Sequence, residues 1–217
     1  MLRFLRYCIV PLARSRSVYI ISVLLTLVLA VQYLGVGGGQ WRLTCLSIAA
    51  VGAVCGLMTV SMVRIPPSFT EYLVVYMGSR NLVRGLWLSV TGLSIIMGLV
   101  AEATLTLLLH LFGTTPDALY AALGLLTSIF AAGLTATLML LGSVIGFTVV
   151  LILSLIQPLV VRLTIPVLSL STRAVALALF LAYAIPSTSI ILLLNVLREE
   201  RLKKLLVKAF RYATFVA

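Results

Sequence analysis

The sequence predicts an all-α, polytopic membrane protein that crosses the bilayer six times. Of its 217 residues, 62% are hydrophobic and only 10% are charged, and the mean hydropathy is +1.23. A water-soluble domain carries about 45–50% apolar and about 25% charged residues. The apolar residues gather in runs of about 20, which is the length that crosses the hydrocarbon layer as a helix. This composition excludes an ordinary soluble fold.

The expected transmembrane helices follow from these runs and from the residues that end them. The first run ends at Gly35 and the second before Pro66-Pro67, because glycine and proline interrupt helices. The 44 residues from Ala118 to Val161 carry no charge and are twice what one crossing needs, so a turn is expected at 142–146. The expected spans cover residues 17–34, 43–63, 85–112, 118–141, 147–161 and 174–197. Residues 162–173 would then form a connector or a re-entrant segment.

The basic residues outside the spans predict the orientation of the chain. Thirteen of the sixteen Lys and Arg residues fall in the N-terminus, in the loop between the second and third spans, and in the C-terminal tail. Because cytoplasmic segments carry the excess of Lys and Arg, both termini are expected on the cytoplasmic side of the plasma membrane. This distribution explains the net charge of +11 without nucleic acid as a partner. A cleavable signal peptide is the alternative interpretation of the first run.

The two ends of the chain, residues 1–16 and 198–217, flank an expected transmembrane domain of residues 17–197. In both ends apolar residues recur at helical spacing among arginines or lysines. Such a pattern is typical of an amphipathic helix that lies on an anionic leaflet and contacts membrane lipids. The alternative is that both ends are basic anchors that fix the topology.

The sequence shows none of the motifs that would indicate an enzyme. It has no GxxxxGK[ST] phosphate loop, no GxSxG and no HExxH. The three cysteines, Cys8, Cys45 and Cys55, lack metal-ligand spacing, and one histidine cannot form a multi-histidine site. We therefore expect no catalytic residue, no metal and no cofactor in this chain. Any transport must draw its energy from a partner or a gradient.

Residues 64–84 form the most informative loop, between the second and third spans on the expected cytoplasmic side. Ser68 is a helix start signal, and Phe69 and Tyr72 follow it at the spacing of one helical face. A short interfacial helix is expected here, followed by a turn and by re-entry into the membrane at Arg84. On these residues alone, a capped surface loop is the alternative.

The same loop resembles the signature loop of ABC type-2 transporter permeases, where a stretch of the form GTLExLLxxPxSRxxLxxGK joins the second and third spans. Residues 70–74 are similar to its TLExLL core and residues 79–85 to its SRxxLxxG portion. The chain departs from the pattern at Phe69, which replaces a glycine, and at 77–78, which lack the proline. In size and layout the chain is most similar to the haem-exporter permease branch of that family.

This resemblance implies a half-transporter. Two permease chains would pair, as a homodimer or with a related permease, and each would rest a coupling helix on a separate ATP-binding subunit. The residues expected by position to couple to that subunit are Phe69, Glu71, Tyr72, Arg80 and Arg84. The expected function is the membrane permease subunit of an ABC-type exporter. The alternative is a non-transport scaffold or anchor subunit of a larger complex. An ion-coupled carrier would show an inverted repeat, which is not evident.

Candidates for a translocation path are the polar residues inside the spans, namely Glu102, Thr106, His110 and Gln157. A charge at the bilayer centre costs about 2.5–3.5 kcal/mol on insertion scales, so Glu102 needs a partner or a proton. It either lines a substrate or proton path or makes an interhelical hydrogen bond, and Thr106 shares its helix face. His110 is either an axial ligand for haem iron or an interfacial histidine. The GxxxG motif at 52–56 favours close helix approach, within the chain or between two copies.

Overall fold

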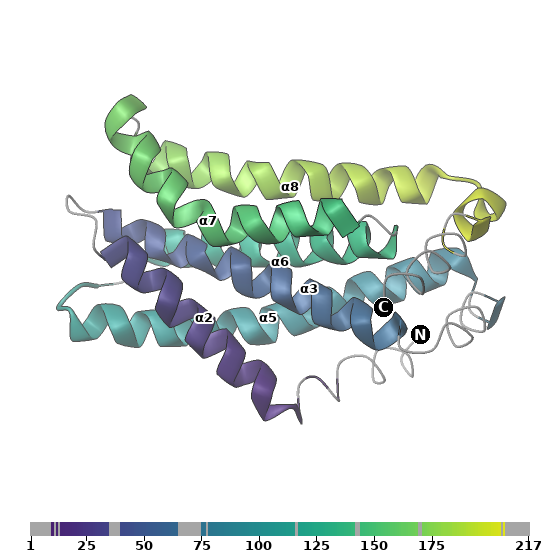
Figure 1. Ribbon diagram of the computed structural model, residues 1–217, viewed down its shortest axis with the longest axis horizontal. Coiled ribbons are helices and arrows are strands. Elements are labelled where there is room, and N and C mark those ends of the chain that lie inside the picture. Colours follow the sequence, from purple (N-terminus) through teal and green to yellow (C-terminus); the bar gives the residue numbers. More distant parts are fainter. Residues whose placement is uncertain are drawn as a thin grey trace.

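The fold is a bundle of apolar helices, seen in a computed structural model (Figure 1). The structure describes residues 10, 12, 14–34, 40–64, 75–76, 78–115, 117–141, 144–168, 171–204 and 206. Every regular element among these residues is helical, which confirms the predicted all-α class. The elements are α2 (Arg16–Leu34), the 3-10 helix η1 (Gln40–Ser47), α3 (Ile48–Arg64), α5 (Ser79–Leu111), α6 (Ala118–Leu140), α7 (Val144–Leu168) and α8 (Thr172–Val196).

Four segments of the described chain are long and apolar enough to cross a membrane. They are Arg42–Val60, Ser79–Leu111, Ala118–Met139 and Thr172–Val196. The helices at the first and fifth expected spans contain shorter apolar segments, Arg16–Val31 and Thr148–Gln157. The protein therefore has the helices of a transmembrane protein.

The helix of the third expected span begins earlier than the sequence indicated. We expected it to start at Gly85, whereas α5 starts at Ser79 and spans 33 residues, about 50 Å at 1.5 Å per residue. Gly78 precedes it with a φ of 78°, a left-handed conformation that favours glycine. Arg80 and Arg84, which we expected in the loop, thus lie on the first two turns of α5.

The long uncharged stretch is divided into two helices, as expected, but residues 144–146 of the expected turn belong to the second helix. α6 ends at Leu140 and α7 begins at Val144 rather than at Phe147. α7 then continues through Pro158 and Pro166 to Leu168. The prediction that residues 162–173 form a loop was therefore wrong for residues 162–168. Prolines are tolerated in transmembrane helices because neighbouring groups take up the freed backbone carbonyls, which explains the difference.

α3 and α6 form the most extensive interface of the bundle, and glycines allow their close approach. A Cβ at Gly52 would overlap the carbonyl oxygen of Ser128, and one at Gly56 would overlap that of Ala132. The GxxxG motif of the second span is thus used for packing within the chain. Correspondingly, 83% of the Arg42–Val60 segment is buried, against 22% of Thr172–Val196, which lies at the periphery.

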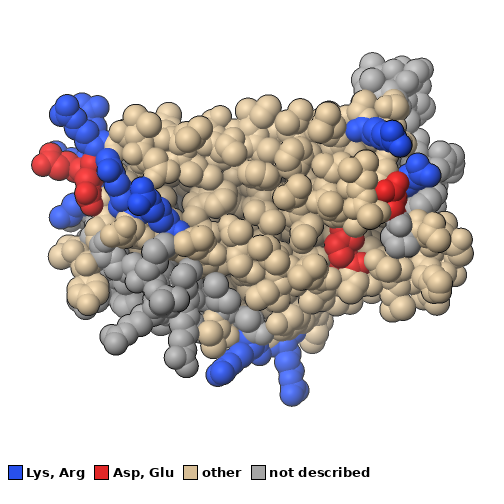
Figure 2. Space-filling model, turned by 180° about the vertical axis from the view of Figure 1, so that it is seen from behind, with Lys and Arg blue, Asp and Glu red and all other residues tan. Residues whose placement is uncertain are grey.

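The surface of the bundle is predominantly apolar. On the face shown in Figure 2, charged side chains gather toward the two ends and at one edge, and the broad middle is uncharged. Large hydrophobic side chains are exposed along the helices, among them Leu99, Leu107, Leu181 and Leu192. An exposed apolar belt between charged ends is the surface that a bilayer solvates.

Candidate functional site

The first candidate site is a layer of polar groups around η1, inside the helix bundle. Glu102 on α5 reaches α6 where that helix has Gly124, and its Oε1 lies 3.1 Å from the position that a Cβ on Gly124 would take. The same missing Cβ leaves room for the carbonyl oxygen of Cys45 in η1, which a side chain at position 124 would overlap. A glycine at this position therefore lets α5, α6 and η1 converge on one point.

The carboxylate of Glu102 is incompletely satisfied in this layer. Its Oε1 is buried and has no hydrogen-bond partner among the residues that the structure describes. A buried oxygen without a partner costs about 1–3 kcal/mol, more if it is charged. Glu102 is partly buried as a residue, and this oxygen can accept a proton or a hydrogen bond from a ligand.

A connected hydrogen-bond chain continues the polar layer from η1 into α7 and α8. Gln157 is 2% exposed and donates from Nε2 to the carbonyl oxygen of Leu46 at 3.3 Å. The hydroxyl of Tyr183 donates to Oε1 of Gln157 at 3.3 Å. The same hydroxyl lies 3.0 Å from Oγ of Ser154. Three helical elements far apart in sequence are thus joined through side chains that a bilayer could not hydrate.

Most other buried hydroxyls in the described bundle are satisfied by their own helices. Thr59 donates to the carbonyl of Cys55 at 2.8 Å, and Thr135 donates to that of Ala131 at 2.8 Å. This i to i−4 bonding hides the hydroxyl from the surroundings. The polar layer around η1 differs because its hydrogen bonds run between elements.

The structure places the four candidate path residues in two groups. Glu102 and Gln157 approach successive residues of η1, Cys45 and Leu46, and so belong to the same polar layer. Thr106 and His110 are exposed on α5. His110 lies in its last turn, where its carbonyl accepts from the amide of Gly113 at 3.0 Å. Thr106 lies one turn from Glu102 on the same face of α5, as expected, but its exposed side chain is not part of the polar layer, and His110 lies a further turn away at the end of the helix.

A second site lies at the end of the bundle where α5 begins and α8 ends. The guanidinium of Arg80 donates from Nη2 to the carbonyl oxygen of Leu197 at 3.1 Å. One residue earlier, Oγ of Ser79 donates to the carbonyl oxygen of Glu199 at 3.4 Å. Residues 197–198 lie between the end of α8 and the helical residues 199–204, and the carbonyl of Leu197, at the end of α8, lacks an intrahelical donor. Arg84 is exposed and lies one turn further along α5.

Apolar packing strengthens this junction, which we call the α5–α8 junction. Buried leucines from both sides form one cluster, in which α5 contributes Leu82 and Leu86 and the chain after α8 contributes Leu202 and Leu206. Leu194 from the last turns of α8 belongs to the same cluster. The start of α5 and the end of α8 are therefore held together by hydrogen bonds and by a shared core.

The other expected coupling residues, Phe69, Glu71 and Tyr72, lie outside the described residues, as does most of the expected N-terminal amphipathic helix of residues 1–16. After α8, residues 199–204 are helical, with Leu202 buried and Arg201, Lys203 and Lys204 exposed. This agrees with the amphipathic pattern predicted for the start of the C-terminal tail.

Sequence reasoning missed Tyr183 and Gly124. A tyrosine in the middle of an apolar span was the available signal for the first, since its hydroxyl requires a partner in the membrane. Nothing in the sequence distinguishes Gly124 from other glycines, because its role depends on which backbone approaches it. No family model, curated protein or solved structure matches this chain.

Proposed function

We propose that this chain is the membrane permease subunit of an ABC-type exporter, driven by a separate subunit that binds and hydrolyses ATP. In this proposal the chain crosses the plasma membrane six times, and two permease chains pair around the path. The segment between α3 and α5 carries the coupling contact. The observation that carries the proposal is the α5–α8 junction, in which Arg80 and Ser79 hold the chain that leaves α8.

The junction connects the expected coupling segment to two transmembrane helices at once. Residues 65–77 lead directly into Gly78 and the first turn of α5. Any displacement of that segment acts on α5 through the chain, and on α8 through the bond from Arg80 to Leu197 and the shared leucine cluster. Packed and hydrogen-bonded contacts of this kind carry energetic coupling between distant sites. A closing pair of ATP-binding subunits would thereby bias α5 and α8 together.

α5 also connects the junction with the polar layer around η1. From Ser79 to Glu102 the helix is continuous, a length of about 35 Å at 1.5 Å per residue. Movement of α5 at its start therefore reaches the unpartnered carboxylate oxygen of Glu102. This arrangement supports a transport role, because an energy input at one end is mechanically joined to a polar group inside the membrane.

The basic residues support the proposed orientation. Six crossings of alternating direction place both termini, the start of α5 and the end of α8 on one side. That side then carries most of the described basic residues, namely Arg14, Arg16, Arg80, Arg84, Arg198, Arg201, Lys203 and Lys204. The other side carries Arg42, Arg162 and Arg173. The excess of Lys and Arg makes the first side cytoplasmic.

The experiment purifies the tagged chain from native membranes, identifies associated proteins by mass spectrometry, and measures ATP hydrolysis by the complex in liposomes. We expect an ATP-binding subunit to co-purify and the chain alone to hydrolyse no ATP. Glu71→Arg should release that subunit, because the charge reversal falls in the expected coupling helix. Arg80→Gln should retain it but uncouple hydrolysis from transport, because the bond to Leu197 is lost.

Arg173→Gln is the matched control, since Arg173 is an exposed arginine at the opposite end of α8. It should leave both binding and hydrolysis as in the parent chain. Recovery of the chain in a stable complex that contains no ATP-binding subunit would contradict the proposal. That result would favour the alternative of a scaffold or anchor subunit.

A further inference from the structure

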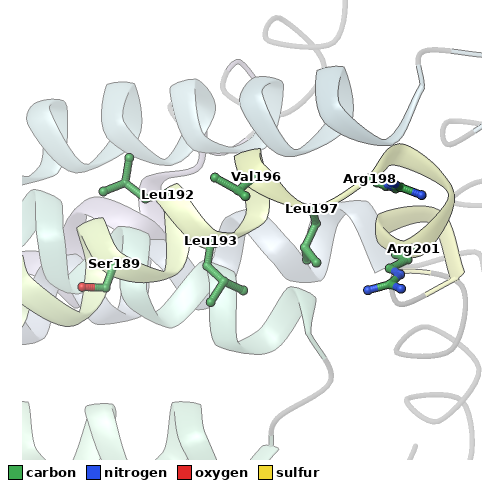
Figure 3. A pocket seen from close by; sticks show the side chains of 7 residues that line it. All are labelled: Ser189, Leu192, Leu193, Val196, Leu197, Arg198 and Arg201. Atoms are coloured by element: carbon green, nitrogen blue, oxygen red, sulfur yellow. The ribbon is translucent and has the colours of Figure 1, made fainter.

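An unfilled groove runs along the end of α8 and the turn that follows it. Its volume is about 720 Å³. Figure 3 shows the side chains that line it, which project from the last turns of α8 and from the start of the helical residues 199–204. Leu192 is 66% exposed, Leu193 62% and Val196 82%. Three large aliphatic side chains in one groove are thus uncovered by the described part of the chain.

The apolar part of the groove has the length of one membrane leaflet. Ser189, Leu193 and Leu197 recur at i+4 along α8, beside the row formed by Leu192 and Val196. From Ser189 to Leu197 the helix rises about 12 Å at 1.5 Å per residue. Half of a hydrocarbon layer about 30 Å thick is about 15 Å. The groove therefore extends from the membrane surface to near its midplane, which is the depth that one acyl chain occupies.

The polar end of the groove is positively charged. Arg198 and Arg201 both line it and are both exposed (Figure 3). Neither Glu199 nor Glu200 is among the described lining residues. Oε1 of Glu199 lies 3.1 Å from the position of a Cβ on Gly78, so this carboxylate faces the start of α5. The two guanidinium groups are thus available to an anion.

We propose that this groove binds an anionic phospholipid, with Arg198 and Arg201 on the phosphate and an acyl chain along Leu192, Leu193 and Val196. A guanidinium group suits the phosphate because its planar donors match the phosphate oxygens, and the exposed aliphatic side chains suit the acyl chain below it. The buried Leu202 and Leu206 hold the arginine-bearing segment against α5, which keeps the charges at the membrane surface. This site does not depend on the transport function proposed above.

Lipid selectivity tests the proposal directly. The full chain is placed in nanodiscs of phosphatidylcholine that contain spin-labelled phosphatidylglycerol or spin-labelled phosphatidylcholine, and the immobilised fraction of each label is measured. We expect the parent chain to immobilise phosphatidylglycerol selectively. In the Arg198→Gln/Arg201→Gln double variant the preference should fall about 25-fold, since a basic residue near an anionic surface contributes about a factor of five.

Two further variants separate the parts of the site. Arg173→Gln, at the other end of the same helix, should retain the preference. Leu193→Trp keeps both arginines but fills the groove, and it should reduce immobilisation of the acyl chain. Its folding is checked by size-exclusion chromatography, as is that of the double variant.

Three results would overturn the proposal. The first is equal immobilisation of both lipids by the parent chain. The second is an unchanged preference in the double variant. The third is efficient disulfide cross-linking between two copies of a Val196→Cys chain in the Cys8→Ser background, because the groove would then be covered by a second copy.

Discussion

Arg80, in the first turn of α5, donates from Nη2 to the carbonyl oxygen of Leu197 at 3.1 Å and so joins residues 117 positions apart. The carbonyl at the end of α8 lacks an intrahelical donor, and the long arginine side chain supplies one. An arginine that a sequence pattern places in a connecting loop thus becomes part of the contact between two transmembrane helices.

Replacement of Arg80 should weaken this contact measurably. Arg80→Gln shortens the side chain and leaves the Leu197 carbonyl without its donor, so we expect the free energy of unfolding to fall by about 1 kcal/mol. The measurement is equilibrium unfolding of the detergent-solubilised chain. Arg84→Gln, exposed on the next turn, should change this free energy by less than half as much. Equal losses of unfolding free energy in both variants would show that the effect comes from the removed charge and not from the bond to Leu197.

The α3–α6 interface should be intolerant of a methyl group at its glycines. Gly52→Ala places a Cβ on the carbonyl oxygen of Ser128, a backbone atom that cannot move without displacing α6. We expect a loss of about 2 kcal/mol or more in the free energy of unfolding.

Gly98→Ala is the matched control for that substitution. Its Cβ would meet Cδ1 of Leu125 at 2.5 Å, which is the far end of a flexible side chain that can rotate away. We expect a loss of less than about 1 kcal/mol. If both alanine variants unfold at the same denaturant concentration, the contact between Gly52 and the backbone of α6 does not explain the need for glycine at position 52.

The hydrogen-bond chain from η1 to α8 should show coupling between its members. Tyr183→Phe removes the donor to Gln157, and Gln157→Leu removes both the acceptor and the bond to Leu46. Each single variant should lose about 1 kcal/mol, and the double-mutant cycle should give a coupling of about 0.6 kcal/mol, the average for hydrogen bonds between membrane helices. Strict additivity of the two losses would contradict a direct bond in the membrane.

Glu102 should be dispensable for folding and required for transport. Glu102→Gln preserves the shape of the side chain and removes its charge. Oε1 has no hydrogen-bond partner to lose among the described residues, so the free energy of unfolding should be unchanged or higher by up to about 1 kcal/mol. Transport by the reconstituted complex should be largely lost.

Thr104→Val provides the comparison for Glu102→Gln. The hydroxyl of Thr104 bonds to the carbonyl of Val100 in its own helix at 2.9 Å, so its removal should leave transport intact. Transport at the parent rate by the Glu102→Gln protein would assign this carboxyl group to a structural role.

Much of the fold is predictable because apolar periodicity and helix-ending residues act locally. The expected span at 118–141 corresponds to α6, Ala118–Leu140, since Asp117 caps its start by accepting from the amide of Leu119 at 3.0 Å. The helix boundaries that were missed depend on tertiary contacts. α5 starts at Ser79, where its first turn binds the chain after α8, and α7 continues as one helix through two prolines.

The site divides in the same way. A carboxylate or an amide in an apolar span is conspicuous in the sequence, so Glu102 was found by the cost of burying its charge and Gln157 as a polar side chain inside a span. Which groups they meet was not predictable, because Cys45, Leu46 and Gly124 contribute backbone atoms or the absence of a side chain.

The sequence by itself determined that this chain is built of apolar helices long enough to cross a membrane, the approximate positions of those helices, and which buried groups are costly. Those properties follow from hydropathy, charge and helix-ending residues, which act within a single turn or a single crossing. Only the tertiary structure decided that η1 gathers Glu102 and Gln157, that Arg80 holds the end of α8, and that Arg198 and Arg201 close a groove. Each of these depends on the direction in which packed helices present their backbone carbonyls and side chains, and that direction is set by contacts between residues far apart in the chain.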